Sequence, residues 1–254
     1  MLFYRCFFVI LHIMIAKTEA IVLHSFKYGE QKLVVDMFTR DHGRLTFMVP
    51  LPKSAKGRLK KQYFQPLTPL TVAYDYRPSL QFQKLTDAGI LQPLSSIQTS
   101  PSKLAISMFV AEFLYHALKG EQQNDPLFAY LCSAIEWLDG RPSQYANFHL
   151  AFLIHLSRFL GFYPNLDGYE AGSYFDLRAG TFCTAPPPHR DLLLPAEAAM
   201  MQTLMRMDFA TMHLFRMNRQ QRAQLLDVAL RYYRLHLPDF PQLRSVEVLK
   251  ELFE

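Results

Sequence analysis

The chain has 254 residues, of which half are apolar and 19% are charged, a composition typical of a globular protein with an ample core. Its net charge of +5 is compatible with nucleic acid or another acidic partner. The three cysteines, Cys6, Cys132 and Cys183, are too few for a disulfide framework. This count excludes the class of disulfide-stapled secreted proteins and favours a reducing, cytoplasmic location.

The first twenty residues imitate a secretory signal peptide, because Arg5 precedes an apolar run from Cys6 to Ala16. The run is too short to span a bilayer comfortably as a helix, and no small-residue pattern marks a cleavage point. Met14 is followed by IAKTEAIVL, a polar entry into a strand. We therefore expect Met14 to be the biological start and residues 1–13 to be a start-site extension or an extra strand. A signal peptide, or a membrane-associated protein, is the alternative.

Residues 18–91 predict β-strands, because segments rich in β-branched and aromatic residues alternate with short polar turns. These segments are AIVLHSF, KLVVDMFT, RLTFMVP, LTPLTVAY and SLQFQKL. Their spacing of about 12 residues fits a small antiparallel barrel. The number and size of the strands match an OB-fold over residues 14–95, although an SH3-like barrel would give a similar pattern.

After Ser100 the apolar residues recur with the period of a helix. Ser100 and Pro101 suit an N-cap and a first helical position, and Leu104, Met108 and Leu114 lie on the expected apolar stripe. Further helices are expected over 125–140, 143–161 and, as three or four segments, 195–253. The sequence therefore predicts an α+β protein whose second domain, residues 96–254, is helical.

A short β-hairpin is expected to interrupt the helices. SYFDLRAGTFCT, residues 173–184, carries RAG as turn residues between two short strand-like segments. The sequence APPPHRD follows and must be an irregular loop. We assign the hairpin and its flanks to residues 165–191.

Motifs of common enzymes are absent from the sequence: there is no Gly-rich phosphate loop, no G-x-S-x-G and no H-E-x-x-H. The nine histidines are scattered, and Cys183 with His189 is too small a set for a tetrahedral zinc site. We therefore expect no catalytic residue, no metal and no cofactor. A hydrolase or nuclease-like enzyme that uses the loop 167–191 is the alternative.

Positive charge is concentrated between Lys17 and Lys61. Ten lysines and arginines stand there against four acidic residues, so the segment carries +6 while the whole chain carries +5. Half of these cations lie in PKSAKGRLKK, residues 52–61, between the third and fourth predicted strands. A basic run on a small barrel can follow a phosphate backbone, which indicates a polyanion partner.

Aromatic residues beside these cations can stack on bases. Tyr28, Phe38 and Phe47 lie among the charges, but alternation along RLTFMVP places Phe47 in the core. Tyr63 and Phe64 directly follow the basic run and are the preferred stacking residues. The predicted DNA-binding residues are Lys27, Lys32, Arg40, Arg44, Lys53, Lys56, Arg58, Lys60, Lys61, Tyr63 and Phe64.

A second group of cations lies in the helical half. Arg216, Arg219 and Arg222 are three residues apart and start a basic stripe on one helix. The stripe is either a solvated face or a second surface for a polyanion.

Several segments resemble the RecO family of bacterial recombination mediators. They are EAIVLHSFKYGEQKLVVDMFTRDHGRLTFMV, the K-G of the basic run, QPLTPLTV, FLIHLSRFLGFYPNL, YFDLRAGTFC and SVEVLKELF. Each motif alone is weak, but their order is specific and covers residues 15–254.

The resemblance implies an N-terminal OB-fold, a helical C-terminal domain and cytoplasmic, nucleoid-associated work in DNA repair. It also implies binding of ssDNA and dsDNA, strand annealing and, with RecR, displacement of single-strand-binding protein so that RecA can load. The basic residues of the OB-fold would carry DNA binding. The acidic, apolar-ended tail of single-strand-binding protein would bind a basic, apolar groove of the helical domain, whose position the sequence does not give.

The hairpin departs from the family pattern, in which many members carry a four-cysteine zinc site. Asp167 and Glu170 stand in the segment of the leading cysteine pair, and only Cys183 remains of the trailing pair. We therefore expect no zinc, and a hairpin held by packing of Tyr174, Phe175 and Phe182.

Overall fold

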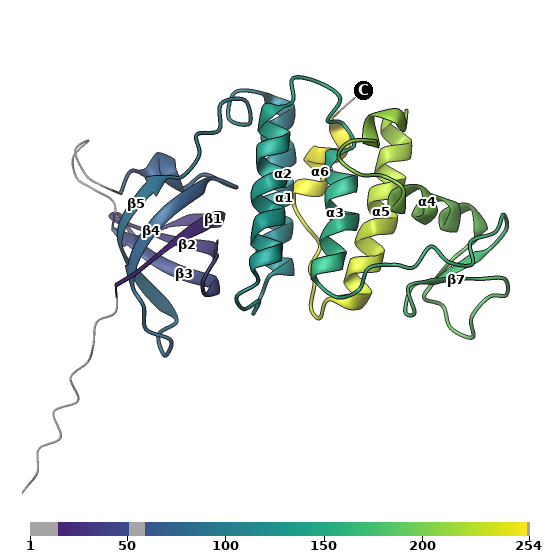
Figure 1. Ribbon diagram of the computed structural model, residues 1–254, viewed down its shortest axis with the longest axis horizontal. Helices are drawn as coiled ribbons and strands as arrows, with labels where there is room; N and C mark the ends of the chain where they lie inside the picture. The colour runs from purple at the N-terminus through teal and green to yellow at the C-terminus, as the bar shows by residue number, and fades with distance from the viewer. Residues whose placement is uncertain (1–14, 51–58, 253–254) are drawn as a thin grey trace, which may run out of the picture.

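Five strands form a closed barrel in the N-terminal part of the chain (Figure 1). The computed structural model describes residues 15–50 and 59–252. The strands are β1 (Ile15–Tyr28), β2 (Lys32–Thr39), β3 (Gly43–Pro50), β4 (Pro69–Asp75) and β5 (Phe82–Ile90). Their order around the barrel is β1-β2-β3-β5-β4, with β4 pairing back to β1 and only β3 and β5 parallel. This is the predicted OB-fold topology, and the SH3-like alternative is excluded.

A β-bulge in β1 reverses the sides to which its residues point. Val22 pairs with Met37 but His24 pairs with Asp36, so Leu23 is the extra residue. Before the bulge Ala20 and Val22 face the barrel interior, whereas Leu23 packs in the core shared with the helices. After the bulge the even-numbered residues of β1 lie outside the barrel.

A short 3₁₀ helix, η1 (Lys61–Phe64), lies against β1 and β5. The Phe64 ring is 1% exposed and belongs to the barrel core, and the Ser25 hydroxyl donates to the Phe64 carbonyl at 2.8 Å. Since Ser25 alternates with His24 and Phe26, η1 lies on the interior side of β1. The predicted start-site extension, residues 1–13, and residues 52–58 of the basic run lie outside the described residues.

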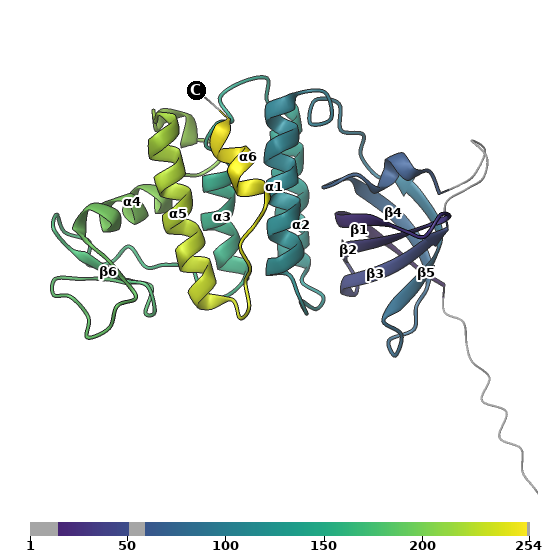
Figure 2. The same ribbon diagram turned by 180° about the vertical axis from the view of Figure 1, so that it is seen from behind.

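Helices form most of the described chain after the barrel, as the period of the apolar residues predicts (Figure 2). They are α1 (Pro101–Ala117), α2 (Asp125–Gly140), α3 (Phe148–Phe159), α4 (Pro195–Met205), η2 (Met212–Leu214), α5 (Arg219–His236) and α6 (Ser245–Glu251). Ser100 is the N-cap of α1 and Pro101 its first residue, as predicted.

The predicted apolar stripe of α1 is partly wrong. Leu104 is 41% and Met108 is 50% exposed, while Ile106, Phe109 and Phe113 are fully buried. The helix packs against the barrel, α5 and α6 on different sides, so its buried surface is wider than one stripe and is displaced from the predicted one.

The predicted basic stripe on α5 is also wrong, because Arg222 does not share a surface with its neighbours. Its side chain is 9% exposed and donates to the Met217 carbonyl at 2.6 Å, whereas Arg216 is exposed. The Arg219 guanidinium donates to the Lys250 carbonyl at 2.7 Å. Arg219 and Arg222 therefore connect the first turn of α5 to α6 and to the segment just before α5.

The predicted hairpin is present and gains a third strand. β6 (Tyr174–Asp176) pairs with β7 (Thr181–Cys183) and with β8 (Leu192–Leu193). Phe175 is fully buried, and its ring centroid lies 4.8 Å from that of Phe182, which confirms the predicted packing of these two residues. Tyr174 is only partly buried.

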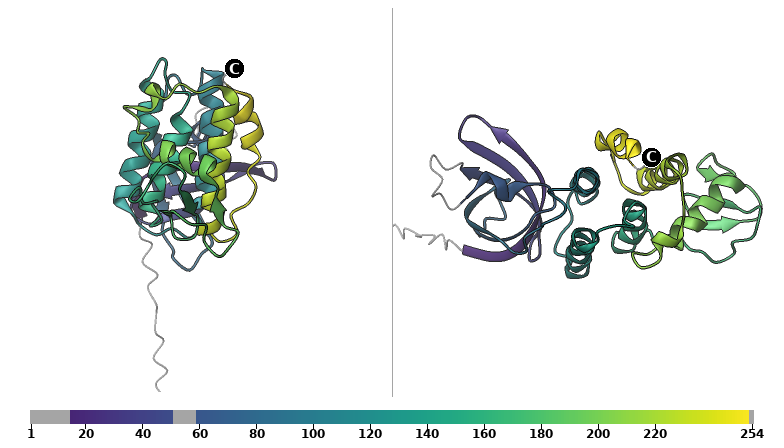
Figure 3. Two further views of the ribbon diagram at one scale, coloured as in Figure 1. Left: turned by 90° about the vertical axis from the view of Figure 1, so that its right-hand side faces the viewer. Right: turned by 90° about the horizontal axis from the view of Figure 1, so that it is seen from above.

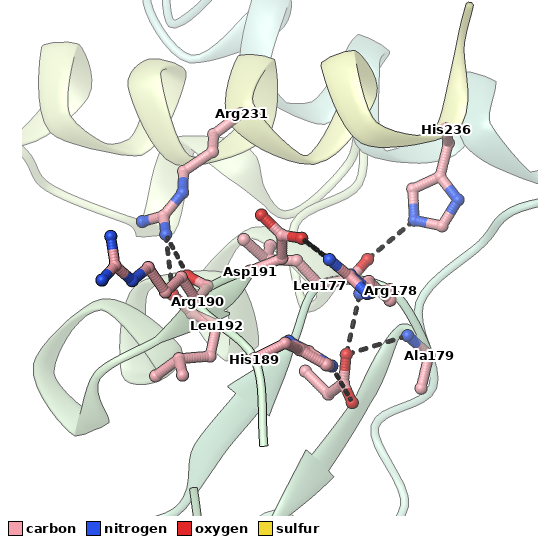
Figure 4. A network of polar contacts seen from close by, with 10 residues as sticks. Leu177, Arg178, Ala179, His189, Arg190, Asp191, Leu192, Arg231 and His236 are labelled. Atoms are coloured by element: carbon pink, nitrogen blue, oxygen red, sulfur yellow. Dashed lines mark hydrogen bonds and ion pairs between the residues drawn. The ribbon is translucent and has the colours of Figure 1, made fainter. Parts of the chain in front are cut away.

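Polar contacts tie this small sheet together and to α5 (Figure 4). The Asp176 carboxylate accepts two backbone N–H bonds from the turn and lies 3.3 Å from the His189 ring. Arg178 and Asp191 form an ion pair at 2.6 Å, and Arg231 of α5 donates to the Leu192 carbonyl at 2.9 Å. Contacts of His189 and Asp191 therefore hold the segment that the sequence predicts as an irregular loop.

The barrel packs against α1 and α2 through outward-facing residues of β1 and β2, and the view from above shows these helices beside it (Figure 3). The Phe38 ring stacks on the Phe128 ring with centroids 6.2 Å apart, and the backbone N–H of Arg44 donates to the Glu121 carbonyl at 3.0 Å. Asp139 of α2 accepts three backbone N–H bonds from residues 95–97 at the end of the connecting segment. The two domains thus share one apolar core at their contact.

Candidate nucleic-acid interface

The outer surface of β1, β2, β3 and β5 carries the exposed aromatic residues of the barrel. Strand register aligns them in rows, because paired residues point to the same face of a sheet. The first row is Tyr28, Lys32 and Pro50; the second is Phe26, Val34, Met48 and Lys84; the third is His24, Asp36, Thr46 and Phe82. We call Phe26, Tyr28, Lys32, Met48, Phe82 and Lys84 the sheet face.

Three rings of the sheet face are open to solvent although they are large and apolar. Tyr28 is 57%, Phe26 is 45% and Phe82 is 41% exposed. Val34, between Phe26 and Met48, is 4% exposed and closes the surface beneath them. Rows two residues apart along a strand are separated by about 6.8 Å, so the three rows span about 14 Å. This is a platform on which several unpaired bases can stack.

The acid of the third row is neutralised within the protein. Asp36 is 4% exposed and accepts from the Thr46 hydroxyl at 2.7 Å and from Arg44 at 3.4 Å. Burial pushes the pKa of Asp36 upward, but bonds from His24, Thr46 and Arg44 outweigh burial and leave this pKa below its usual value. The exposed charges of the face are therefore those of Lys32 and Lys84.

One residue of the predicted set, Lys32, belongs to the sheet face, where it pairs with Tyr28. Lys27 lies on the other side of β1, where it pairs with Leu33 of the interior side, and it is exposed. Lys60 and Lys61 are exposed at η1 on that same side. Lys53, Lys56 and Arg58 lie outside the described residues.

The predicted stacking residue Phe64 is buried, and this part of the prediction is wrong. Its ring is 1% exposed because η1 inserts it into the barrel core. Tyr63 is half-buried, with the Lys60 ammonium 5.9 Å from its ring centroid. Phe38 and Phe47 are fully buried, the latter as alternation predicts.

The two predicted arginines of the barrel are engaged in internal contacts. Arg40 forms an ion pair with Glu19 at 2.8 Å, and its guanidinium lies 4.9 Å from the Phe128 ring centroid. The Arg44 side chain is 14% exposed and lies over the Tyr115 ring, where it also donates to the Tyr115 carbonyl. Both residues join the barrel to the helices, and neither lies on the sheet face.

Sequence reasoning missed Phe26 and Phe82. Alternation from Ala20 and Val22 would place Phe26 inside the barrel, and only the bulge at Leu23 turns it outward. Phe82 alternates with Gln83, which is 2% exposed because its amide bonds to backbone groups of Arg77 and Leu80. Because the polar Gln83 points inward and the apolar Phe82 points outward, the alternation of β5 does not show which side faces the interior.

No group of three or more His, Cys, Asp or Glu residues that could hold a metal occurs in residues 15–50 and 59–252. Of the two sequence candidates near the hairpin, His189 faces Asp176, and the Cys183 thiol lies 3.9 Å from the Tyr174 carbonyl. Over the same described residues, every helix is too short or too polar to cross a membrane.

A closed five-stranded barrel with exposed rings and lysines across adjacent strands is the ligand-binding arrangement of OB-fold proteins that take up oligonucleotides. Comparison with known proteins narrows this class. The family model for Recombination protein O N terminal matches residues 14–94, and the one for Recombination protein O C terminal matches residues 98–245.

Relatives of similar length carry one name, "DNA repair protein RecO". The chain is 49% identical to the Bacteroides fragilis protein over 95% of this chain and 100% of the relative. It is 46% identical to the Phocaeicola vulgatus protein over 94% and 100%, and 31% identical to the Porphyromonas gingivalis protein over 95% and 100%. The chain belongs to the RecO family, whose members act in DNA repair and recombination.

Proposed function

We propose that the chain binds single- and double-stranded DNA through the sheet face, without strong sequence preference, and anneals complementary strands. Together with RecR it helps to load RecA onto strands covered by single-strand-binding protein. The observation that carries the proposal is the contiguous set of exposed rings with two lysines on the outer barrel surface. Rings stack on any base, and lysines bind any phosphate, so little sequence preference is expected.

The proposal assigns binding rather than turnover, with no catalytic residue and no cofactor. Work at chromosomal DNA would put the chain on the nucleoid in the cytoplasm. A nuclease or hydrolase that uses the loop 167–191 is the competing function. The loop's acids favour a structural role, since Asp176 binds the turn and Asp191 pairs with Arg178. Incubation with labelled DNA, with and without divalent metal, should leave the DNA intact.

The tail of single-strand-binding protein is acidic with an apolar end, and its binding site should combine a pocket lined by aromatic rings with nearby cations. We place this site at the surface beside Trp137, where Arg141 and His213 lie together with Phe209. The Arg141 guanidinium lies 4.9 Å from the Trp137 ring centroid. Arg141→Glu should weaken binding of a tail peptide while DNA binding stays unchanged.

The test of the DNA-binding proposal is binding to unrelated oligonucleotides as a function of salt. Affinities should be similar among sequences and should fall steeply with salt. Neutralising Lys53, Lys56, Arg58, Lys60 and Lys61 should reduce the slope for single strands by about 3.5 if each cation meets a phosphate. A slope equal to that of the parent would refute the assignment of this loop.

A further inference from the structure

Aromatic rings continue from the sheet face across the domain boundary. The His24 ring lies 5.6 Å from the Phe26 ring and 4.7 Å from the Tyr115 ring, centroid to centroid. The Tyr115 ring in turn lies 4.9 Å from the His116 ring on the last turn of α1. The His24 side chain is 45% exposed, and Tyr115 and His116 are partly exposed. The rings form an unbroken path from the barrel onto the helical domain.

Two cations, Arg44 and Lys119, lie near this path. Burial is the main cause that lowers the pKa of His116, and the positive charges of Arg44 and Lys119 lower it further. The neighbouring acid, Glu112, opposes this effect, but its carboxylate is engaged by the backbone N–H groups of Arg244 and Ser245 at the start of α6. We call His24, Arg44, Tyr115, His116 and Lys119 the junction cluster.

Part of the junction cluster has a structural explanation. The Arg44 guanidinium lies 4.3 Å from the Tyr115 ring centroid and donates to the Tyr115 carbonyl, which satisfies an end carbonyl of α1. That role requires neither the exposed His24 ring beside it nor an exposed Lys119. Exposed aromatic rings beside solvent-exposed cations are the combination that binds single-stranded nucleic acid.

We propose that the junction cluster is a second contact for single-stranded DNA, which leaves the sheet face at Phe26 and continues over His24 and Tyr115 onto the end of α1. The inference rests on the proposed function, because it extends the path of the same strand. One bound strand then touches both domains. A strand shorter than the sheet face does not reach the helical domain, whereas a longer strand does.

The experiment compares two labelled oligothymidines by fluorescence anisotropy. One has about 3 nucleotides, which at ~3.4 Å or more per nucleotide do not exceed the sheet face, and the other has about 20 nucleotides, since OB-fold sites cover about 4–16 nucleotides. The junction variant is His116→Ala with Lys119→Glu, and Phe26→Ala is the sheet-face variant. The matched control is Arg234→Glu with Leu235→Ala, two exposed residues of α5. Thermal unfolding of each variant checks that it is folded.

The junction variant should bind the long strand about fivefold more weakly or worse, which corresponds to the loss of one stacked base, and should bind the short strand as the parent does. The control should match the parent with both strands. Parental affinity of the junction variant for the long strand, or an equal loss with both strands, overturns the inference.

The same data separate this inference from the proposed function. If Phe26→Ala weakens binding of both strands while the junction variant behaves as the parent, only the continuation fails. If the parent binds neither strand, or Phe26→Ala changes neither affinity, the proposed use of the sheet face fails and the continuation fails with it. Photo-crosslinking of a thiothymidine-containing long strand should label the peptide that contains Tyr115, and labelling elsewhere alone contradicts the inference.

Discussion

The contact between barrel and helices depends on a glycine. Gly43 has a φ of +67°, and a Cβ at this position would lie 2.3 Å from the Glu121 carbonyl oxygen and 2.5 Å from the Gln122 carbonyl carbon. Both atoms belong to the backbone of the loop after α1, so Gly43→Ala must push that loop away. The move breaks the bond from the Arg44 N–H to the Glu121 carbonyl.

Gly29→Ala is the matched control. Gly29 has a φ of +64°, but nothing lies within 4 Å of its hypothetical Cβ. Both substitutions place alanine in the left-handed region at a cost of about 1 kcal/mol. Gly43→Ala adds a lost hydrogen bond of about 1 kcal/mol and the displacement of a packed loop, for a total of about 3 kcal/mol.

Urea unfolding measures the difference as the free energy of unfolding extrapolated to water. We expect Gly43→Ala to lose about 2 kcal/mol more than Gly29→Ala. Equal losses in the two variants would refute the view that close backbone approach at Gly43 joins the domains. Because the domains share a core, the junction variants should also be compared in this assay.

Three further predictions concern charge. Hydrogen bonds hold the pKa of Glu112 and of Asp139 below their usual values despite burial, so the stability from these groups is full above pH 4.5 and is lost as pH falls through the folded-state pKa values. The urea concentration at the unfolding midpoint should therefore decrease as the pH is lowered below 4.5. Asp139→Asn should make this decrease with pH less steep. Lys32→Gln with Lys84→Gln should lower the salt slope of single-strand binding by about 1.4, as measured by anisotropy titrations. Asp176→Ala should speed limited proteolysis within 177–191 and leave the barrel resistant, since its carboxylate holds the turn; unchanged cleavage would show that packing alone holds the hairpin.

Much of the fold follows from local pattern. The five strands are short, β-rich segments separated by polar turns, and α2 ends at Gly140 as its sequence predicts. The α1 stripe was misplaced because this helix is covered from several sides. Period alone does not show how many partners a helix has.

The site was less predictable, for reasons that lie in tertiary structure. Phe26 reaches the surface through one inserted residue, Leu23, which no single-sequence signal marks. Phe64 looks exposed beside five cations, but η1 turns it into the core. Composition correctly placed positive charge on the barrel, yet it could not show that Arg40 and Arg44 bind internal partners.

The central claim is that the exposed rings of the sheet face bind single-stranded DNA. The most direct measurement is the affinity of Phe26→Ala with Phe82→Ala for a labelled oligothymidine, against the parent and a control, Leu214→Ala, whose side chain is 68% exposed on η2. Two lost stacking partners should weaken binding at least about thirtyfold, since each is worth about 1–3 kcal/mol, and the control should bind as the parent does. Equal affinity of all three proteins would contradict the account.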